Sequence, residues 1–115
     1  MALIYILSSK TGMDVPALFV AQDKVAHLMV FGVLGVFIAQ ADARPGQPLL
    51  MRQVLFTTLL VTTYGLLDEY HQSFVPGRSP SLWDVAADGL GGLLAALSVR
   101  SARTWWLTRS ALISR

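Results

Sequence analysis

The side chains that could do chemistry in this chain gather in a few short stretches. Carboxylates and histidines can exchange protons with a substrate or bind a metal ion, and an arginine can hold a phosphate or carboxylate with two parallel hydrogen bonds. These stretches contain Asp23, Lys24 and His27, then Asp68, Glu69, His71 and Gln72, then Arg78, Ser81, Asp84 and Asp88. Because ionisable groups are costly within or beside a membrane, these residues are candidates for a functional site.

The spacing of these residues places several of them on shared helix faces. Residues three or four apart lie on the same side of an α-helix. The pairs with this spacing are Asp23 with His27, Glu69 with Gln72, and Asp84 with Asp88. The face of the last pair continues into a ridge of small residues, Ala87, Gly91 and Ala95. A neighbouring helix can approach such a ridge closely, so the acidic residues are predicted to turn into a helix bundle.

The same residues also have purely structural explanations. Asp23 could cap a helix, Ser81 with Asp84 has the pattern of a capping box, and Lys24 could extend its ammonium to a membrane surface. Arg78 could neutralise neighbouring acids in an ion-pair network without further function. Two histidines, several carboxylates and an arginine exceed what capping requires, so we favour a functional site.

Three apolar stretches must position these side chains. Residues 25–41, 53–67 and 89–99 carry no charge, and they are apolar around their whole circumference, which favours helices buried in lipid. Turn-forming residues separate them at 42–48 and 75–80. The sequence predicts an all-α fold, a small polytopic transmembrane helical bundle with three full spanning helices at about residues 25–41, 50–72 and 82–100.

The two ends of the chain do not fit full spans. Residues 1–7 are apolar but cover only about 10 Å as a helix, so they are predicted to be a short N-terminal apolar segment, either interfacial or partly inserted, or the remnant of a fourth helix. Residues 101–115 combine two tryptophans with arginines, which predicts an interfacial tail along the headgroups. The chain, residues 1–115, is expected to form a single membrane domain.

Composition excludes several classes of protein. The 115 residues are 54% hydrophobic and 14% charged, whereas soluble domains carry about 25% charged residues. A conventional soluble enzyme is therefore disfavoured. The absence of cysteine rules out disulfides, thiolate metal sites and a cysteine nucleophile. The formal net charge is only +2, and no basic stripe is interleaved with aromatic residues, so no nucleic-acid partner is expected.

The distribution of basic residues predicts the orientation. On one side of the predicted bundle lie Lys10, Lys24 and Arg78. On the other side lie Arg44, Arg52, Arg100, Arg103, Arg109 and Arg115. The positive-inside rule makes the arginine-rich side cytoplasmic, and the C-terminus with it. The candidate site is therefore predicted at the outer face.

The polar residues resemble the motif of a known family. Asp23-Lys24-x-x-His27 followed by LLDEYHQSFVPGRSPSLWDVAADGLGGLL over residues 66–94 is similar to the VanZ-like family of small bacterial membrane proteins, named after the teicoplanin-resistance accessory protein. The resemblance covers roughly residues 7–99. The chain departs from the pattern at Asp88, where the family often has Asn, and in its short first segment, since relatives usually look like four-helix proteins. The resemblance implies a multi-pass protein of the bacterial inner (cytoplasmic) membrane, linked to glycopeptide susceptibility, and implies no particular reaction.

The favoured hypothesis is an outer-face site that binds or handles the headgroup of a membrane lipid or a lipid-linked envelope precursor. Arg78 would contact phosphate or carboxylate, with the other groups supplying donors and acceptors. The predicted ligand-binding residues are Asp23, Lys24, His27, Glu69, Gln72, Arg78, Asp84 and Asp88. Three helices enclose little volume, so a homo-oligomer is a further expectation.

Other functions stay open beside this hypothesis. A membrane hydrolase or transferase acting on a lipid-linked phosphate would draw its catalytic groups from His27, His71, Glu69 and Asp84. The same four residues could bind Zn²⁺, but no HExxH-type spacing supports a metal, and none is expected, nor any other cofactor. A structural or scaffolding role fits the ridge of small residues. Whether the chain is an enzyme is left undecided.

Overall fold

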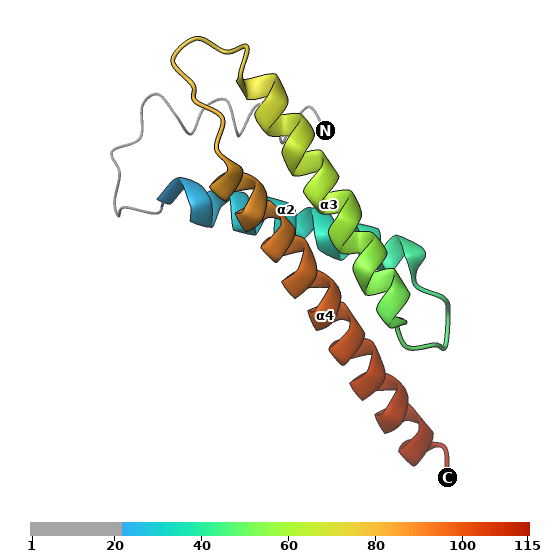
Figure 1. Cartoon of the computed structure of the whole chain (residues 1–115). Helices are drawn as coiled ribbons and strands as arrows, with labels where there is room; N and C mark the ends of the chain where they lie inside the picture. Colours follow the sequence, from blue (N-terminus) through green and yellow to red (C-terminus); the bar gives the residue numbers. More distant parts are fainter. Residues whose placement is uncertain (1–21) are drawn as a thin grey trace.

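The described part of the chain consists of α-helices. The computed structural model describes residues 22–115 and contains α2 (Gln22–Asp42), α3 (Met51–Gln72) and α4 (Leu82–Ile113), with no strand among these residues (Figure 1). The prediction of an all-α fold is confirmed. The predicted N-terminal segment, residues 1–7, lies outside the described residues.

Two turns reverse the chain between the helices. Gly46 and Gly77 adopt positive φ angles of 69° and 80°, which glycine tolerates because it has no Cβ. The start of α3 is fixed by Gln53, whose Oε1 accepts the Leu50 N–H at 2.7 Å and whose Nε2 donates to the Asp42 carbonyl at 2.6 Å. One side chain therefore joins the end of α2 to the beginning of α3.

Helix α4 packs against both other helices through small residues. A Cβ atom on Gly91 would lie 2.5 Å from the Leu28 carbonyl oxygen of α2, and one on Gly92 would lie 2.7 Å from Val61 Cβ of α3. Backbones approach this closely only where side chains are absent. Gly91 and Ala95, two members of the predicted ridge, are both buried, so the ridge faces the interior of the bundle as its spacing predicted.

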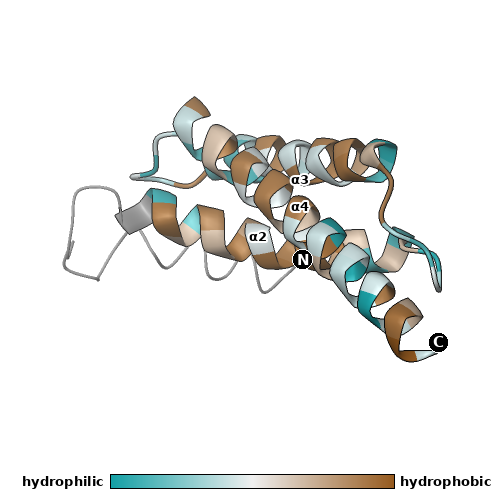
Figure 2. Cartoon of the chain, turned by 90° about the horizontal axis from the view of Figure 1, so that it is seen from below, coloured by the Kyte–Doolittle hydropathy of each residue, from teal (hydrophilic) through white to brown (hydrophobic). Residues whose placement is uncertain are grey.

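Large apolar side chains cover the outside of the bundle. Met29, Phe37, Leu55 and Leu59 are each more than 60% exposed, and apolar residues occur along all three helices in Figure 2. Lys24–Asp42 and Leu82–Ile113 are long and apolar enough to cross a membrane. The core helix of a soluble protein would be mostly buried, whereas only 22% of the apolar window of α2 is buried.

Helix α4 is longer than the sequence predicted. The expected end near residue 100 is absent, and the helix continues through the expected tail to Ile113. No glycine or proline occurs after residue 92 to end it. Its 32 residues correspond to about 48 Å at 1.5 Å per residue, beyond the roughly 30 Å of a hydrocarbon core. The C-terminal part of α4 extends past the rest of the bundle (Figure 1).

Candidate functional site

The ends of three helices bring charged side chains together. Lys24 near the start of α2 forms an ion pair with Asp84 in the first turn of α4, with Nζ and Oδ1 2.7 Å apart. One turn further along both helices, His27 Nδ1 lies 2.9 Å from Asp88 Oδ1. Asp88 is fully buried and His27 is 7% exposed. These two pairs join α2 to α4 at residues about 60 positions apart in sequence.

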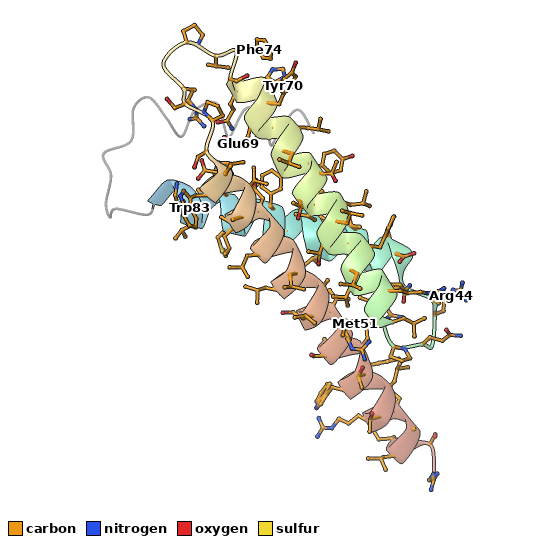
Figure 3. All side chains as sticks on the ribbon, viewed as in Figure 1. Arg44, Met51, Glu69, Tyr70, Phe74 and Trp83 are labelled. Carbon is orange, nitrogen blue, oxygen red and sulfur yellow. The ribbon has the colours of Figure 1, made fainter. Side chains whose placement is uncertain are left out.

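Glu69 of α3 completes this polar cluster. It lies on the side of α3 that faces the beginning of α4 (Figure 3), and its Oε2 accepts the backbone N–H of Ser81 at 2.7 Å. The other oxygen, Oε1, is buried and has no hydrogen-bond partner among the described residues. The expected capping box is wrong in detail, since Ser81 forms no side-chain capping hydrogen bond. Its backbone is instead held by Glu69.

Arg78 is held in place by the side-chain amide of Gln72, a residue of α3. The Gln72 Oε1 atom accepts hydrogen bonds from Arg78 Nη2 at 2.6 Å and from Nε at 3.2 Å. The Gln72 amide nitrogen donates to Asp68 Oδ2 at 2.8 Å. Asp68, Gln72 and Arg78 thus form a chain of hydrogen bonds that fixes the plane of the guanidinium group.

The opposite end of the bundle is held by arginines. Arg100 donates to the Leu49 carbonyl, and Arg103 donates to the Arg44 and Gln47 carbonyls. These bonds tie the turn at 43–50 to α4. A groove of about 500 Å³ lies beside them, lined by residues that include Arg103, Trp105 and Trp106. The polar cluster and these arginines therefore occupy different ends of the molecule.

Comparison with known proteins identifies the family. The sequence pattern of the VanZ/LLP1 family matches residues 3–105, which include all of the polar cluster. The chain belongs to the VanZ/LLP1 family. No curated protein and no solved structure matches it. Membership confirms the resemblance of the motif at residues 66–94, and the two long apolar helices agree with a membrane protein of the VanZ/LLP1 family.

Most of the predicted site residues come together in this VanZ/LLP1 chain. His27, Glu69 and Asp84 each place one potential ligand atom within 4.8 Å of the others, and all three are buried. Lys24 and Asp88 contact two of them directly, whereas Gln72 and Arg78 bond to each other one turn along α3 from Glu69. His71 is not among these three residues, and it is exposed. The Asp23 side chain lies outside the described residues.

Two residues beside the polar cluster were missed by sequence reasoning. Gly65 lies beside Asp88, because a Cβ there would be 2.5 Å from Asp88 Oδ2. Phe31 is buried and stacks on the His27 ring with a centroid distance of 6.0 Å. Both lie four residues from a predicted site residue, Gly65 before Glu69 and Phe31 after His27. Extending the helical spacing by one turn in each direction would have found them.

Proposed function

We propose that the polar cluster binds the headgroup of a membrane lipid or of a lipid-linked envelope precursor. The observation that carries this proposal is the guanidinium of Arg78, which Gln72 holds beside the cluster through two hydrogen bonds. A guanidinium has five N–H donors, and those not used by Gln72 can bind a phosphate oxygen. An arginine fixed in one plane is suited to bidentate recognition of phosphate.

Glu69 could bind a part of the headgroup other than its phosphate. Glu69 Oε1 is a buried acceptor without a donor among the described residues. Hydroxyl and amide groups of a sugar headgroup are donors that could satisfy it. The apolar exterior of the bundle is compatible with lipid chains lying alongside. A precursor held in this way would be less accessible to a glycopeptide such as teicoplanin, which would link the site to antibiotic susceptibility.

Arg78→Ala is expected to weaken lipid binding at least tenfold. Hydrogen bonds to charged groups contribute about 1.5–3 kcal/mol each, and 1.4 kcal/mol is a factor of ten in affinity. The measurement is native mass spectrometry of the detergent-purified protein titrated with undecaprenyl phosphate, with phosphatidylglycerol as a competing bulk lipid. Arg115→Ala, at the other end of the chain, is the matched control. Equal binding by the wild type and Arg78→Ala would refute the proposed site.

The bundle is proposed to cross the bacterial inner membrane three times, with the polar cluster outside. Helix α3 has 22 residues, about 33 Å at 1.5 Å per residue. Its threonines lower its hydropathy, yet Thr58, Thr62 and Thr63 donate their hydroxyls to carbonyls four residues earlier. Hydroxyls satisfied within the helix reduce the cost of placing α3 in lipid. The arginine-rich end then faces the cytoplasm.

Ser73→Cys is expected to react with a membrane-impermeant thiol reagent added to intact cells, whereas Ser110→Cys is not. Ser73 is exposed just after α3, at the end that carries the cluster, and Ser110 lies in the last turns of α4. The chain has no cysteine of its own, so each label reports one position. Labelling of both variants in permeabilised cells is the control. Reaction of Ser110→Cys alone in intact cells would reverse the orientation.

A second candidate function rests on the contact between His27 and Asp88. A histidine oriented by a buried carboxylate is the arrangement of a general base, and here the two atoms are 2.9 Å apart. A hydrolase or transferase acting on a lipid-linked phosphate would use His27 in this role, with Arg78 stabilising developing charge. Release of phosphate from undecaprenyl pyrophosphate, lost in His27→Ala, would favour this function. Recovery of the lipid unchanged favours binding.

A further inference from the structure

We infer that His27, Glu69 and Asp84 hold a divalent transition-metal ion, with Zn²⁺ or Mn²⁺ matching the mixed donor set. One ring nitrogen of His27 and one carboxylate oxygen each of Glu69 and Asp84 lie within 4.8 Å of one another. Imidazole nitrogen suits zinc, and carboxylate oxygen suits both zinc and manganese. In a tetrahedral site with bonds of about 2.0–2.2 Å, ligand atoms are about 3.4 Å apart. Side-chain movements of about 1 Å would close the site.

Each of the three side chains has one polar atom bound to another element, and the second oxygen of Glu69 has no hydrogen-bond partner among the described residues. His27 Nδ1 contacts Asp88, Glu69 Oε2 accepts the Ser81 N–H, and Asp84 Oδ1 binds Lys24. Metal-binding side chains are commonly oriented in this way by outer partners. A neutral His27 that donates its Nδ1–H to Asp88 presents Nε2 as the atom that can bind a metal.

The buried oxygen of Glu69 is the second observation that points to a cation. Glu69 is 5% exposed, and its Oε1 has no hydrogen-bond partner among the described residues. A buried ionised carboxylate without a counter-charge is strongly unfavourable. A metal ion would satisfy this oxygen and compensate the charge of Glu69.

This metal site rests on the proposed function only for its fourth ligand. Three protein ligands leave one tetrahedral position open, as in zinc sites that bind water or substrate. Arg78 is held by Gln72, which lies one turn of α3 from Glu69. A phosphate oxygen of the bound headgroup could therefore occupy the open position while other oxygens contact Arg78. The ligand class that this geometry favours is a phosphorylated lipid.

The test measures metal directly on protein purified without a histidine tag. Wild-type protein in detergent is expected to carry close to one zinc or manganese ion per chain by inductively coupled plasma mass spectrometry. His27→Ala and Glu69→Gln are each expected to carry less than a tenth of that amount. His71→Ala is the matched control, because His27 and His71 are the two histidines of the chain and His71 is exposed. It should keep the wild-type content.

A second measurement on the wild type keeps the inference testable if a variant fails to fold. After removal of metal by a chelator, adding Zn²⁺ or Mn²⁺ should raise the melting temperature of the wild type and of His71→Ala by several degrees. Wild-type protein that contains neither metal and does not respond to either would overturn the inference. A His71→Ala variant that loses as much metal as His27→Ala would also overturn it.

Arg78→Ala separates this inference from the proposed function. We expect Arg78→Ala to retain the metal while losing undecaprenyl phosphate. A metal-free wild type whose lipid binding still depends on Arg78 would refute the metal site alone. A metal-containing wild type whose binding of undecaprenyl phosphate is unchanged by Arg78→Ala would refute the headgroup site alone. A parallel titration with inorganic phosphate shows whether the lipid chain is needed.

Discussion

Asp88→Ala is expected to lower the free energy of unfolding by about 3–5 kcal/mol, the usual cost of removing one partner from a buried pair. Asp88 is fully buried, and its Oδ1 accepts from His27 across two helices. Alanine would leave the His27 ring buried without this partner. Since whole domains are stable by only about 5–15 kcal/mol, the loss would be a large fraction of the total.

The measurement is thermal unfolding in detergent micelles, followed by circular dichroism. Asp88→Asn is the conservative variant, because its side-chain oxygen can still accept from a neutral His27, so its loss should be only about 1 kcal/mol, the difference between a hydrogen bond to a charged acceptor and an ordinary one. Asp42→Ala, an exposed acid at the end of α2, is the control and should melt like the wild type. If Asp88→Ala also melts like the wild type, the pair does not stabilise the bundle.

Gly91→Ala is expected to separate α2 from α4, at a cost of about 1–3 kcal/mol, as overpacking in a close-packed interior does. The added Cβ would lie 2.5 Å from the Leu28 carbonyl oxygen and 3.1 Å from the Gly32 nitrogen. Both are backbone atoms of α2, so no side chain can rotate to relieve the contact. The helices themselves must move apart, which would also disturb the ion pairs at their ends.

Gly32→Ala, on the α2 side of the same interface, is the matched control for Gly91→Ala. A Cβ on Gly32 would meet its nearest neighbour, the Gly91 carbonyl oxygen, at 3.7 Å, an ordinary contact distance. Alanine is also favoured over glycine within a helix by up to about 1 kcal/mol. Gly32→Ala should therefore melt at or slightly above the wild-type temperature in the same micelles. Equal behaviour of the two variants would show that α2 and α4 do not approach as closely as described.

The sequence predicts where the helices lie better than where they end. Apolar stretches and turn residues predicted helices at about 25–41, 50–72 and 82–100, against the observed α2 (Gln22–Asp42), α3 (Met51–Gln72) and α4 (Leu82–Ile113). Hydropathy detects the part of a helix that enters lipid, whereas a helix ends where its backbone is broken. The polar residues after Val99 offer no such break, so α4 continues beyond the stretch that hydropathy predicted.

The faces of single helices were also predictable, but the partners across helices were not. Four-residue spacing correctly grouped Asp84 with Asp88 on a buried face. Pairing Lys24 with Asp84 and His27 with Asp88 depends on the register and rotation of α2 against α4, which no local pattern encodes. His71 was included because of its residue type. Two residues after Glu69, it is rotated by about 200° around α3 and points outward.

The sequence grouped His27, Glu69 and Asp84 with His71 as possible zinc ligands, but the missing HExxH-type spacing gave no support for a metal. A motif such as HExxH is a property of one helix, whereas His27, Glu69 and Asp84 come from α2, α3 and α4. Their separations along the chain are unrelated to their separations in space. The unpartnered Glu69 oxygen, which supports the metal proposal, is visible only once the surrounding helices are in place.

Lys24 and His27 of α2 have their carboxylate partners on α4, which affects how the protein is made. Synthesis proceeds from the N-terminus, so α2 and α3 emerge from the ribosome before Ser81, Asp84 and Asp88 do. During that interval Lys24 and His27 lack the carboxylates that they contact in the finished protein. Lipid penalises such groups strongly. If the bundle crosses the membrane as proposed, we expect the insertion machinery to retain α2 and α3 until α4 arrives, so that α2, α3 and α4 are released into the bilayer as one unit.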